Sequence, residues 1–377
     1  MNPICVIGTG LAGYTLAKEL RRQKYSGSLV LITADEGRYY SKPLLSTALA
    51  QNKDTTSLTL ATAEQMASEL QAEIKTGSPV TAIDTRQRTV TFGDRSLTYD
   101  KLVLAIGSSP IRLPLTGDGA QDVLSVNNLD DYGHFRQRVQ QARRVAIIGP
   151  GLIGCEFAND LLQSGREVLI IGPDRWPISS LLPEQAGRAV QQALANHGAI
   201  WHLETVNGPI ERSDTGYRTV LNNGAAVTAD LILSAVGVRP VTALAQQSGL
   251  QVERGIVTDG YLRTSAVDIF ALGDCAAVNG RNLPFVAPLM AGAKALAATL
   301  CGQETAVSYP VMPIAIKTTL YPIVTLPPAT TEGHWEMEQS GSDVTGRHFN
   351  AQGIVDGFVL TGQATTKKST FIKELNP

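Results

Sequence analysis

The sequence contains one glycine pattern twice, each time directly after a short apolar run. The two copies are Gly8, Thr9, Gly10, Leu11, Ala12 and Gly13, and Gly149, Pro150, Gly151, Leu152, Ile153 and Gly154. In this pattern the first glycine allows a tight turn, the second lets a pyrophosphate approach the backbone, and the third lets a helix pack against a strand. The phosphates then meet the free N–H groups of the helix N-terminus. Two dinucleotide sites in one chain suggest that one nucleotide reduces the other.

Each pattern needs a buried parallel strand before it and a helix after it. The apolar, largely β-branched runs Ile4–Ile7 and Val145–Ile148 predict these strands. The next strand of each unit is predicted at Leu29–Ile32 and at Glu167–Ile171. The sequence therefore predicts an α/β protein with two Rossmann-like three-layer domains.

An acidic residue after the second strand of such a unit normally binds the ribose hydroxyls. In the first unit this role falls to the turn of Thr33, Ala34, Asp35 and Glu36, and the choice among these four residues stays open. In the second unit Gly172 takes the usual place of the acid, Asp174 follows two residues later, and Arg175 could bind a 2′-phosphate. The residues alone therefore leave NADH and NADPH open.

Composition restricts the classes of protein to which the chain can belong. Its 377 residues, 43% of them hydrophobic, suffice for two or three domains with their own cores. The net charge of −2 gives no argument for binding nucleic acid or an anionic membrane. The four cysteines have no paired spacing, which predicts reduced thiols and a cytoplasmic location. We expect no metal site, signal peptide or membrane-spanning segment.

The stretch Tyr39 to Ser46 (YYSKPLLS) resembles a known family. It is similar to the loop and helix beneath FAD in the ferredoxin-reductase and rubredoxin-reductase branches of the glutathione-reductase-like flavoproteins, which have two dinucleotide-binding domains. The resemblance implies that Lys42 pairs with Glu156 beside flavin N5. A buried lysine needs a carboxylate partner, and a positive charge near N5 favours the arrival of hydride. Lys42 and Glu156 are therefore the predicted catalytic residues.

The cysteines that serve other members of this family are missing. Disulphide reductases carry Cys-x4-Cys on this helix, and related NADH oxidases carry one cysteine near the position of Thr47. The sequence has no cysteine between Cys5 and Cys155, and no His-x4-Glu pair near its C-terminus. The resemblance therefore implies that electrons leave the flavin directly and not through a thiol.

Further positions match the family in chain order. The resemblance assigns cofactor contacts to Val80 near the adenine, Gly107 after the "ATG"-like strand, Gly237 beside the nicotinamide, Gly273 and Asp274 at the ribityl chain, Val286 at a helix N-terminus, and Lys317 near the flavin. It also implies an FAD-binding domain at residues 1–112 and 241–316, an inserted NAD(P)H-binding domain at 113–240, and a small C-terminal α+β domain at 317–377. Because that last domain is short, a monomer is expected.

The combination of these motifs resembles most the rubredoxin-reductase branch. It implies that FAD takes a hydride from NADH and passes single electrons to the iron of rubredoxin, in support of alkane hydroxylation. One alternative is an NADH-dependent ferredoxin reductase. Others are an NADH oxidase that uses O2, against which Thr47 counts, and an NADH-sensing flavoprotein similar to relatives of apoptosis-inducing factor.

Overall fold

The computed structural model describes residues 2–330 and 332–375. The chain forms two compact units, each assembled from three stretches. Unit 1 comprises Met1–Lys42, Thr56–Ser109 and Val238–Pro310, and unit 2 comprises Pro43–Thr55, Pro110–Gly237 and Val311–Pro377.

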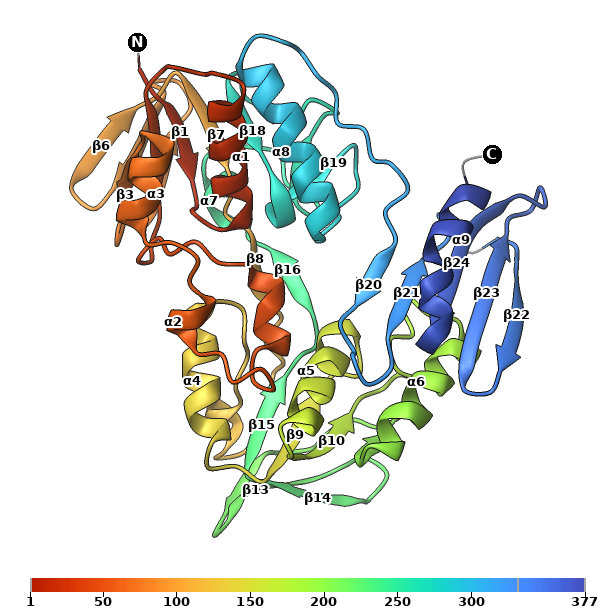
Figure 1. The fold of residues 1–377 in the computed structure, drawn as a ribbon. Helices are drawn as coiled ribbons and strands as arrows, with labels where there is room; N and C mark the ends of the chain where they lie inside the picture. The colour runs from red at the N-terminus through yellow and green to blue at the C-terminus, as the bar shows by residue number, and fades with distance from the viewer. Residues whose placement is uncertain (1, 331, 376–377) are drawn as a thin grey trace. The chain divides into compact units, whose positions relative to one another are not determined.

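The centre of unit 1 is a five-stranded parallel sheet in the order β18-β7-β1-β2-β3. Its strands are β1 (Ile4–Ile7), β2 (Leu29–Ile32), β3 (Glu73–Lys75), β7 (Lys101–Leu104) and β18 (Ile269–Ala271). The helices of this unit are α1 (Leu11–Arg22), α3 (Ala63–Leu70), α7 (Ala243–Gln247) and α8 (Val286–Leu300). Helices α1 and α8 lie side by side (Figure 1), and their apolar side chains join those of the strands in one buried core.

Smaller elements complete unit 1. They include the antiparallel strands β4 (Val80–Asp84), β5 (Thr89–Phe92) and β6 (Arg95–Thr98), and the parallel pair β17 (Ile256–Thr258) and β19 (Ala276–Val278). Strand β8 (Ser108–Pro110) pairs with β16 (Val238–Pro240), and two short 3-10 helices are η1 (Lys42–Thr47) and η3 (Gly273–Cys275). By residue number, β8 and η1 both end in unit 2. The short helix α2 (Thr55–Leu58) lies where the chain returns from unit 2 to unit 1. Residues 81–92, in which polar and apolar side chains alternate in part, belong to the antiparallel pair of β4 and β5.

Unit 2 contains a second parallel sheet, in the order β11-β10-β9-β15. Its strands are β9 (Arg144–Ile148), β10 (Glu167–Ile171), β11 (Ala199–His202) and β15 (Leu231–Ser234), and its helices are α4 (Leu129–Val139), α5 (Leu152–Gln163) and α6 (Glu184–Asn196). The 3-10 helix η2 (Ala120–Asp122) precedes α4, whose N-cap is the Asn128 side chain, accepting from the N–H of Asp131.

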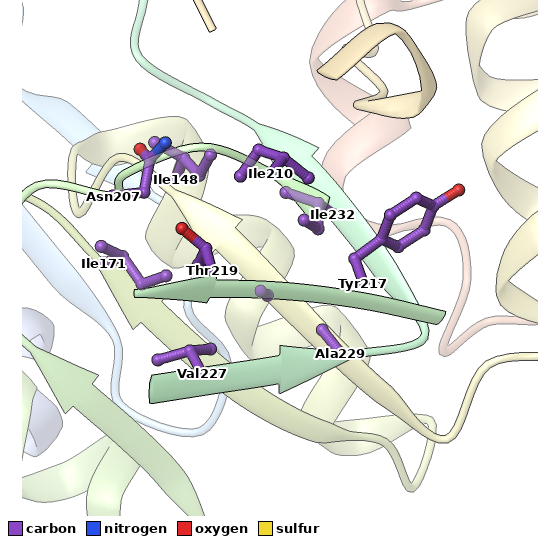
Figure 2. Close-up of a pocket in the computed structure, with 10 residues that line it drawn as sticks. Ile148, Ile171, Asn207, Ile210, Tyr217, Thr219, Val227, Ala229 and Ile232 are labelled. Carbon is purple, nitrogen blue, oxygen red and sulfur yellow. The ribbon is translucent and has the colours of Figure 1, made fainter. Parts of the chain in front are cut away.

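An antiparallel sheet of β12 (Glu211–Ser213), β13 (Gly216–Val220) and β14 (Ala226–Ala229) packs on the parallel sheet of unit 2. Between the two sheets lies a small cavity (Figure 2), whose lining side chains include Ile148, Ile171 and Val227. Its volume of about 10 Å³ holds one water at most. The amide N–H of Asn207 and the hydroxyl of Thr219, which also line it, both donate to the carbonyl of Gly208. The cavity is therefore a packing gap in the core.

The C-terminal part of unit 2 is an antiparallel sheet in the order β20-β21-β24-β23-β22. Its elements are β20 (Ile314–Ile316), β21 (Ile323–Leu326), β22 (His334–Ser340), β23 (Asp343–Phe349), β24 (Val355–Thr361), the 3-10 helix η4 (Gly362–Lys367) and α9 (Lys368–Glu374). Helix α9 lies on this sheet (Figure 1), with Phe371 packed on Phe358. Helix α6 also contacts β23 and β24.

The elements that the sequence predicts around both glycine patterns are present. Strands β1, β2 and β10 have the predicted bounds, and β9 begins one residue earlier than predicted, at Arg144. Among residues 2–330 and 332–375, no helix is long and apolar enough to cross a membrane. The same residues contain no group of histidine, cysteine or carboxylate side chains suited to a metal ion.

Candidate functional site: two nucleotide turns and a buried carboxylate

The first glycine turn joins β1 to α1. Gly8 has φ +111°, and a Cβ on it would lie 2.3 Å from the carbonyl oxygen of Ala105, the residue that follows the neighbouring strand β7. A Cβ on Gly13 would lie 1.9 Å from the carbonyl oxygen of Gly8, so helix and turn touch backbone to backbone. Gly10, the N-cap of α1, has φ −65° and nothing within 4 Å of its Cβ position. The first and third glycines thus allow close packing, and the second faces open space.

The second glycine turn, between β9 and α5, repeats this geometry. Gly149 has φ +112°, and its Cβ position lies 2.6 Å from the carbonyl oxygen of Ala235. The Cβ position of Gly154 lies 1.9 Å from the carbonyl oxygen of Gly149, and that of Gly151 has nothing within 4 Å. Neither Gly10 nor Gly151 supplies a side-chain cap, so the first N–H groups of α1 and α5 have no such partner. Both turns therefore fit a pyrophosphate at an uncapped helix N-terminus.

The other residues of the two patterns lie at the starts of the helices. Thr9 and Ala12 are buried, and Leu11, Leu152 and Ile153 are half-buried. Their side chains pack the turn, while the backbone of Gly10 and Gly151 is left accessible.

The turn after β2 contains the predicted ribose-binding residues. Asp35 Oδ1 accepts the hydroxyl of Thr33 at 2.7 Å and the N–H of Gly37 at 2.9 Å. Ala34 and Asp35 are exposed, and Glu36 forms an ion pair with Arg38 at 3.0 Å. Asp35 therefore shapes the turn through one oxygen, which fixes its position, and the choice of ribose-binding residue among the four stays a prediction.

A second group in unit 1 lies around Asp274. Gly273 has φ +79°, and its Cβ position is 2.9 Å from the Cβ of Ala12, so Asp274 comes close to the first glycine turn. Asp274 Oδ2 accepts the hydroxyl of Ser108 at 2.7 Å, and Lys42 Nζ lies 3.5 Å from the same hydroxyl oxygen. The sequence analysis missed Ser108, although it follows Gly107 directly. The structure thus joins two of the predicted residues, Lys42 and Asp274, through Ser108.

The remaining predicted positions of unit 1 lie at the ends of elements. Val80 begins β4, Gly107 forms the turn between β7 and β8 with φ +69°, and Val286 is the first residue of α8 and 43% exposed. The free N–H groups at the start of α8 have no side-chain cap, which suits an acceptor atom there.

Glu156, on the second turn of α5, is the centre of the site in unit 2. Its side chain is only 3% exposed and takes three hydrogen bonds. Oε2 accepts from the Ser46 hydroxyl at 2.6 Å and from Lys317 Nζ at 2.5 Å, and Oε1 accepts from the backbone N–H of Lys317 at 3.0 Å. Lys317 follows β20, which ends one residue before it. The pairing of Glu156 with Lys42 stays a prediction.

Helix α5 continues this polar face with two residues that the sequence analysis missed. Asn159 Oδ1 accepts the N–H of Leu320 at 2.9 Å, and its amide donates to Thr319 at 3.3 Å. Asp160 accepts the N–H groups of Leu49 and Ala50 at 2.9 and 3.0 Å. The spacing of Glu156, Asn159 and Asp160 (i, i+3, i+4) puts them on one helix face, a signal visible in the sequence. This face fastens the segments after Pro43 and around Lys317 to the helix that begins at the second glycine turn.

Asp160 gives a prediction that a pH series can check. Burial raises the pKa of its carboxyl group to about 6, and the N–H groups of Ala50 and Leu49 lower it by less. Because this pKa lies above that of an unfolded aspartate, the stabilisation belongs to the protonated form, is complete below pH ~4 and is lost as the pH rises to about 6. Relative to Asp160→Asn, the free energy of unfolding of the wild type should fall by about 2 kcal/mol between about pH 4.5 and 7.

Urea unfolding followed by tryptophan fluorescence measures this difference. Asp94→Asn, in the exposed turn between β5 and β6, is a matched control that should leave the pH dependence unchanged. Parallel stability curves for the wild type and Asp160→Asn would contradict the prediction.

The cysteines do not take part in this site as reactive thiols. Cys5, Cys155 and Cys275 are buried, and all four cysteines are free. Burial raises the pKa of Cys5 to about 12 and that of Cys275 to about 11, and it also raises the pKa of Cys155. Thiols with such pKa values are protonated at neutral pH and are poor nucleophiles. Cys275 is fully buried next to Asp274 and packs there as a small side chain.

Gly237 lies after β15 with φ +102°, and its carbonyl accepts the N–H of Ile111 at 3.0 Å. Its Cβ position has only the side chain of Ile111 near it, at 3.6 Å. This edge of the parallel sheet, at the carboxyl ends of β9 and β15, is where Rossmann-type domains bind ligands.

Comparison with known proteins gives two matches along the chain. Residues 2–295 match the pyridine nucleotide-disulphide oxidoreductase family, and residues 306–375 match the rubredoxin binding C-terminal domain. The chain is 45% identical over 377 residues to rubredoxin-NAD(+) reductase of Alcanivorax borkumensis, covering 100% of this chain and 99% of the relative. It is 40% identical over 386 residues to rubredoxin-NAD(+) reductase of Acinetobacter baylyi, covering 100% and 98%.

A solved structure shows the same fold. The crystal structure of a ferredoxin reductase from Rhodopseudomonas palustris has a TM-score of 0.89 at 24% identity, covering 98% of this chain and 93% of that chain. The first sequence match includes both glycine turns, Glu156 and Asp274. The chain therefore belongs to the pyridine nucleotide-disulphide oxidoreductases.

Proposed function

We propose that the chain is an FAD-dependent reductase that takes electrons from NADH and delivers them singly to the iron of rubredoxin. The observation that carries this proposal is the duplicated glycine turn, in a chain whose residues 306–375 match a rubredoxin binding domain. The names of the relatives from Alcanivorax borkumensis and Acinetobacter baylyi support it.

FAD would bind to unit 1. Its pyrophosphate fits the open space at Gly10, its ribose the turn at Asp35, and its polyol the carboxylate of Asp274. Bound flavin supplies the ability to accept two electrons as a hydride and to release them one at a time. The Ser108 hydroxyl orients Asp274, and Lys42 brings a positive charge to the same group.

The nicotinamide nucleotide would bind at Gly149, Gly151 and Gly154 in unit 2. Glu156 holds Lys317 by both its backbone N–H and its ammonium group, so Lys317 has one defined position. We propose that Lys317 supplies positive charge to the reacting ring and that Glu156 orients it, while a role for Lys42 stays a prediction from the resemblance. No thiol takes part, because the buried cysteines are protonated.

The domain assignment follows from these sites. We propose that residues 1–112 and 241–316 form the FAD-binding domain, that 113–240 form the NADH-binding domain, and that 317–377 receive rubredoxin. The four free cysteines also support a cytoplasmic location. Supply of electrons to alkane hydroxylation stays a prediction from the resemblance.

Anaerobic mixing of the purified yellow protein with NADH and stoichiometric rubredoxin tests the function. We expect rapid loss of the visible absorbance of oxidised rubredoxin, much slower reduction of a plant-type ferredoxin, and weak activity with NADPH. Fast ferredoxin reduction with inert rubredoxin would favour the ferredoxin alternative. Reduction of the flavin without reduction of either carrier would contradict the proposal.

A further inference from the structure

The carboxyl end of β10 is where a Rossmann-type domain distinguishes NADH from NADPH. Gly172 stands there in place of the usual acid, and a Cβ on it would lie 2.2 Å from Cδ of Pro150 in the glycine turn. A side chain at position 172 would therefore displace the turn that binds the pyrophosphate. The side chains that contact the adenosine ribose and its 2′ position must therefore come from residues further along the chain.

The segment that follows Gly172 is held against the glycine turn. The N–H of Ile178 donates to the carbonyl of Pro150 at 2.8 Å, although Ile178 has φ +58°, which a β-branched residue rarely adopts. The hydroxyl of Ser179 donates to Asp174, and the indole N–H of Trp176 donates to the carbonyl of Leu182 at 3.0 Å. A strained residue persists only where its surroundings hold it, so Asp174 and Arg175 belong to a fixed loop.

The neighbouring strand adds a second carboxylate to this loop. After β11, the N–H of Glu204 donates to the carbonyl of Asp174 at 3.1 Å, and the N–H of Thr205 donates to that of Gly172 at 3.1 Å. The carboxylate of Glu204 then lies 3.7 Å from Nε of Arg175, and the two side chains are 63% and 76% exposed. The positive charge of Arg175 is therefore already paired, with Asp174 close by.

We propose that Glu204 is a specificity-determining residue, which makes NADH and not NADPH the reductant by pairing with Arg175. A 2′-phosphate brings about two negative charges. It would meet the carboxylates of Asp174 and Glu204, and an arginine that has to leave its partner. The 2′-hydroxyl of NADH is neutral and can donate to a carboxylate. This inference rests on the proposed function, because it requires a nicotinamide nucleotide at the second glycine turn.

Binding of nucleotide fragments to the FAD-loaded protein tests the inference without any electron acceptor. ADP-ribose and 2′-phospho-ADP-ribose are titrated by calorimetry, with tryptophan fluorescence as a second signal, to which Trp176 in the loop contributes. Glu204→Gln should raise the affinity for the 2′-phosphate about 5–10-fold, less at high salt, and should change that for ADP-ribose less than about 2-fold. The second-order rate constant for reduction of the bound flavin by NADPH should rise by the same factor, and Glu204→Gln/Arg175→Ala should lose the gain.

Glu211→Gln is the matched control, because Glu211 is also exposed and pairs with Arg218 at 3.6 Å in the same unit. An unchanged ratio of the two affinities in Glu204→Gln would overturn the inference. A gain that survives in Glu204→Gln/Arg175→Ala, or appears in Glu211→Gln, would overturn it too. Failure to reduce rubredoxin with the affinity shift intact would overturn the proposed acceptor and leave this inference standing.

Discussion

Gly10→Ala should give a folded chain that does not retain FAD, and Gly151→Ala a folded, yellow chain that NADH reduces poorly. At both positions a Cβ meets nothing within 4 Å, and φ of −65° and −75° suits alanine. The methyl group would occupy only the space that a pyrophosphate needs. Loss of two charge-assisted hydrogen bonds costs about 3 kcal/mol, or about 100-fold in affinity.

The two variants act as controls for each other. Visible absorbance reports the FAD that stays bound, calorimetry with ADP-ribose reports the second site, and stopped-flow mixing with NADH gives the rate of flavin reduction. Gly10→Ala should still bind ADP-ribose, and Gly151→Ala should still contain FAD. Unchanged reduction by NADH in Gly151→Ala, or full retention of FAD in Gly10→Ala, would contradict the assignment of the two turns.

Alanine at Gly13 or Gly154 would not give this information. A Cβ there would lie 1.9 Å from a carbonyl oxygen of the turn, so the helix would have to move away from the strand. Such variants should lose stability and nucleotide binding together.

Lys317→Met should destabilise the protein and slow its reduction by NADH. The substitution removes the ammonium partner of a carboxylate that is 3% exposed, while the Ser46 hydroxyl and the backbone N–H at position 317 still donate to Glu156. Removing one partner of a buried ion pair lowers the free energy of unfolding by about 3 kcal/mol. If Lys317 supplies positive charge at the reacting ring, hydride transfer should also slow by about 10-fold or more.

A double-mutant cycle separates the two effects. Glu156→Gln/Lys317→Met has no uncompensated charge, so it should recover part of the stability lost in Lys317→Met, but not the rate. Lys294→Met, at an exposed lysine of α8, is the control and should change neither. A double variant as unstable as Lys317→Met, or a Lys317→Met protein with the wild-type rate, would show that the pair does not have this role.

The local structure at the two glycine patterns could be predicted from the sequence. Strand, turn and helix at both glycine patterns follow from residues within about twenty positions, because φ above zero at Gly8 and Gly149 and apolar runs before them leave few conformations. The order of the matching motifs along the chain was enough to indicate the family.

The sequence by itself therefore determined two nucleotide turns, their strands and helices, and the absence of a cysteine pair for thiol chemistry. Only the tertiary structure decided which polar groups meet. Glu156 contacts Ser46, 110 positions away, and Lys317, 161 positions away. Asp160 contacts the backbone of Leu49, and Arg175 pairs with Glu204, which follows the next strand, β11. The hydrophobic periodicity of the sequence does not predict such pairs. A distant hydrogen-bond partner depends on how whole helices and strands pack, and not on the conformational preference of either residue.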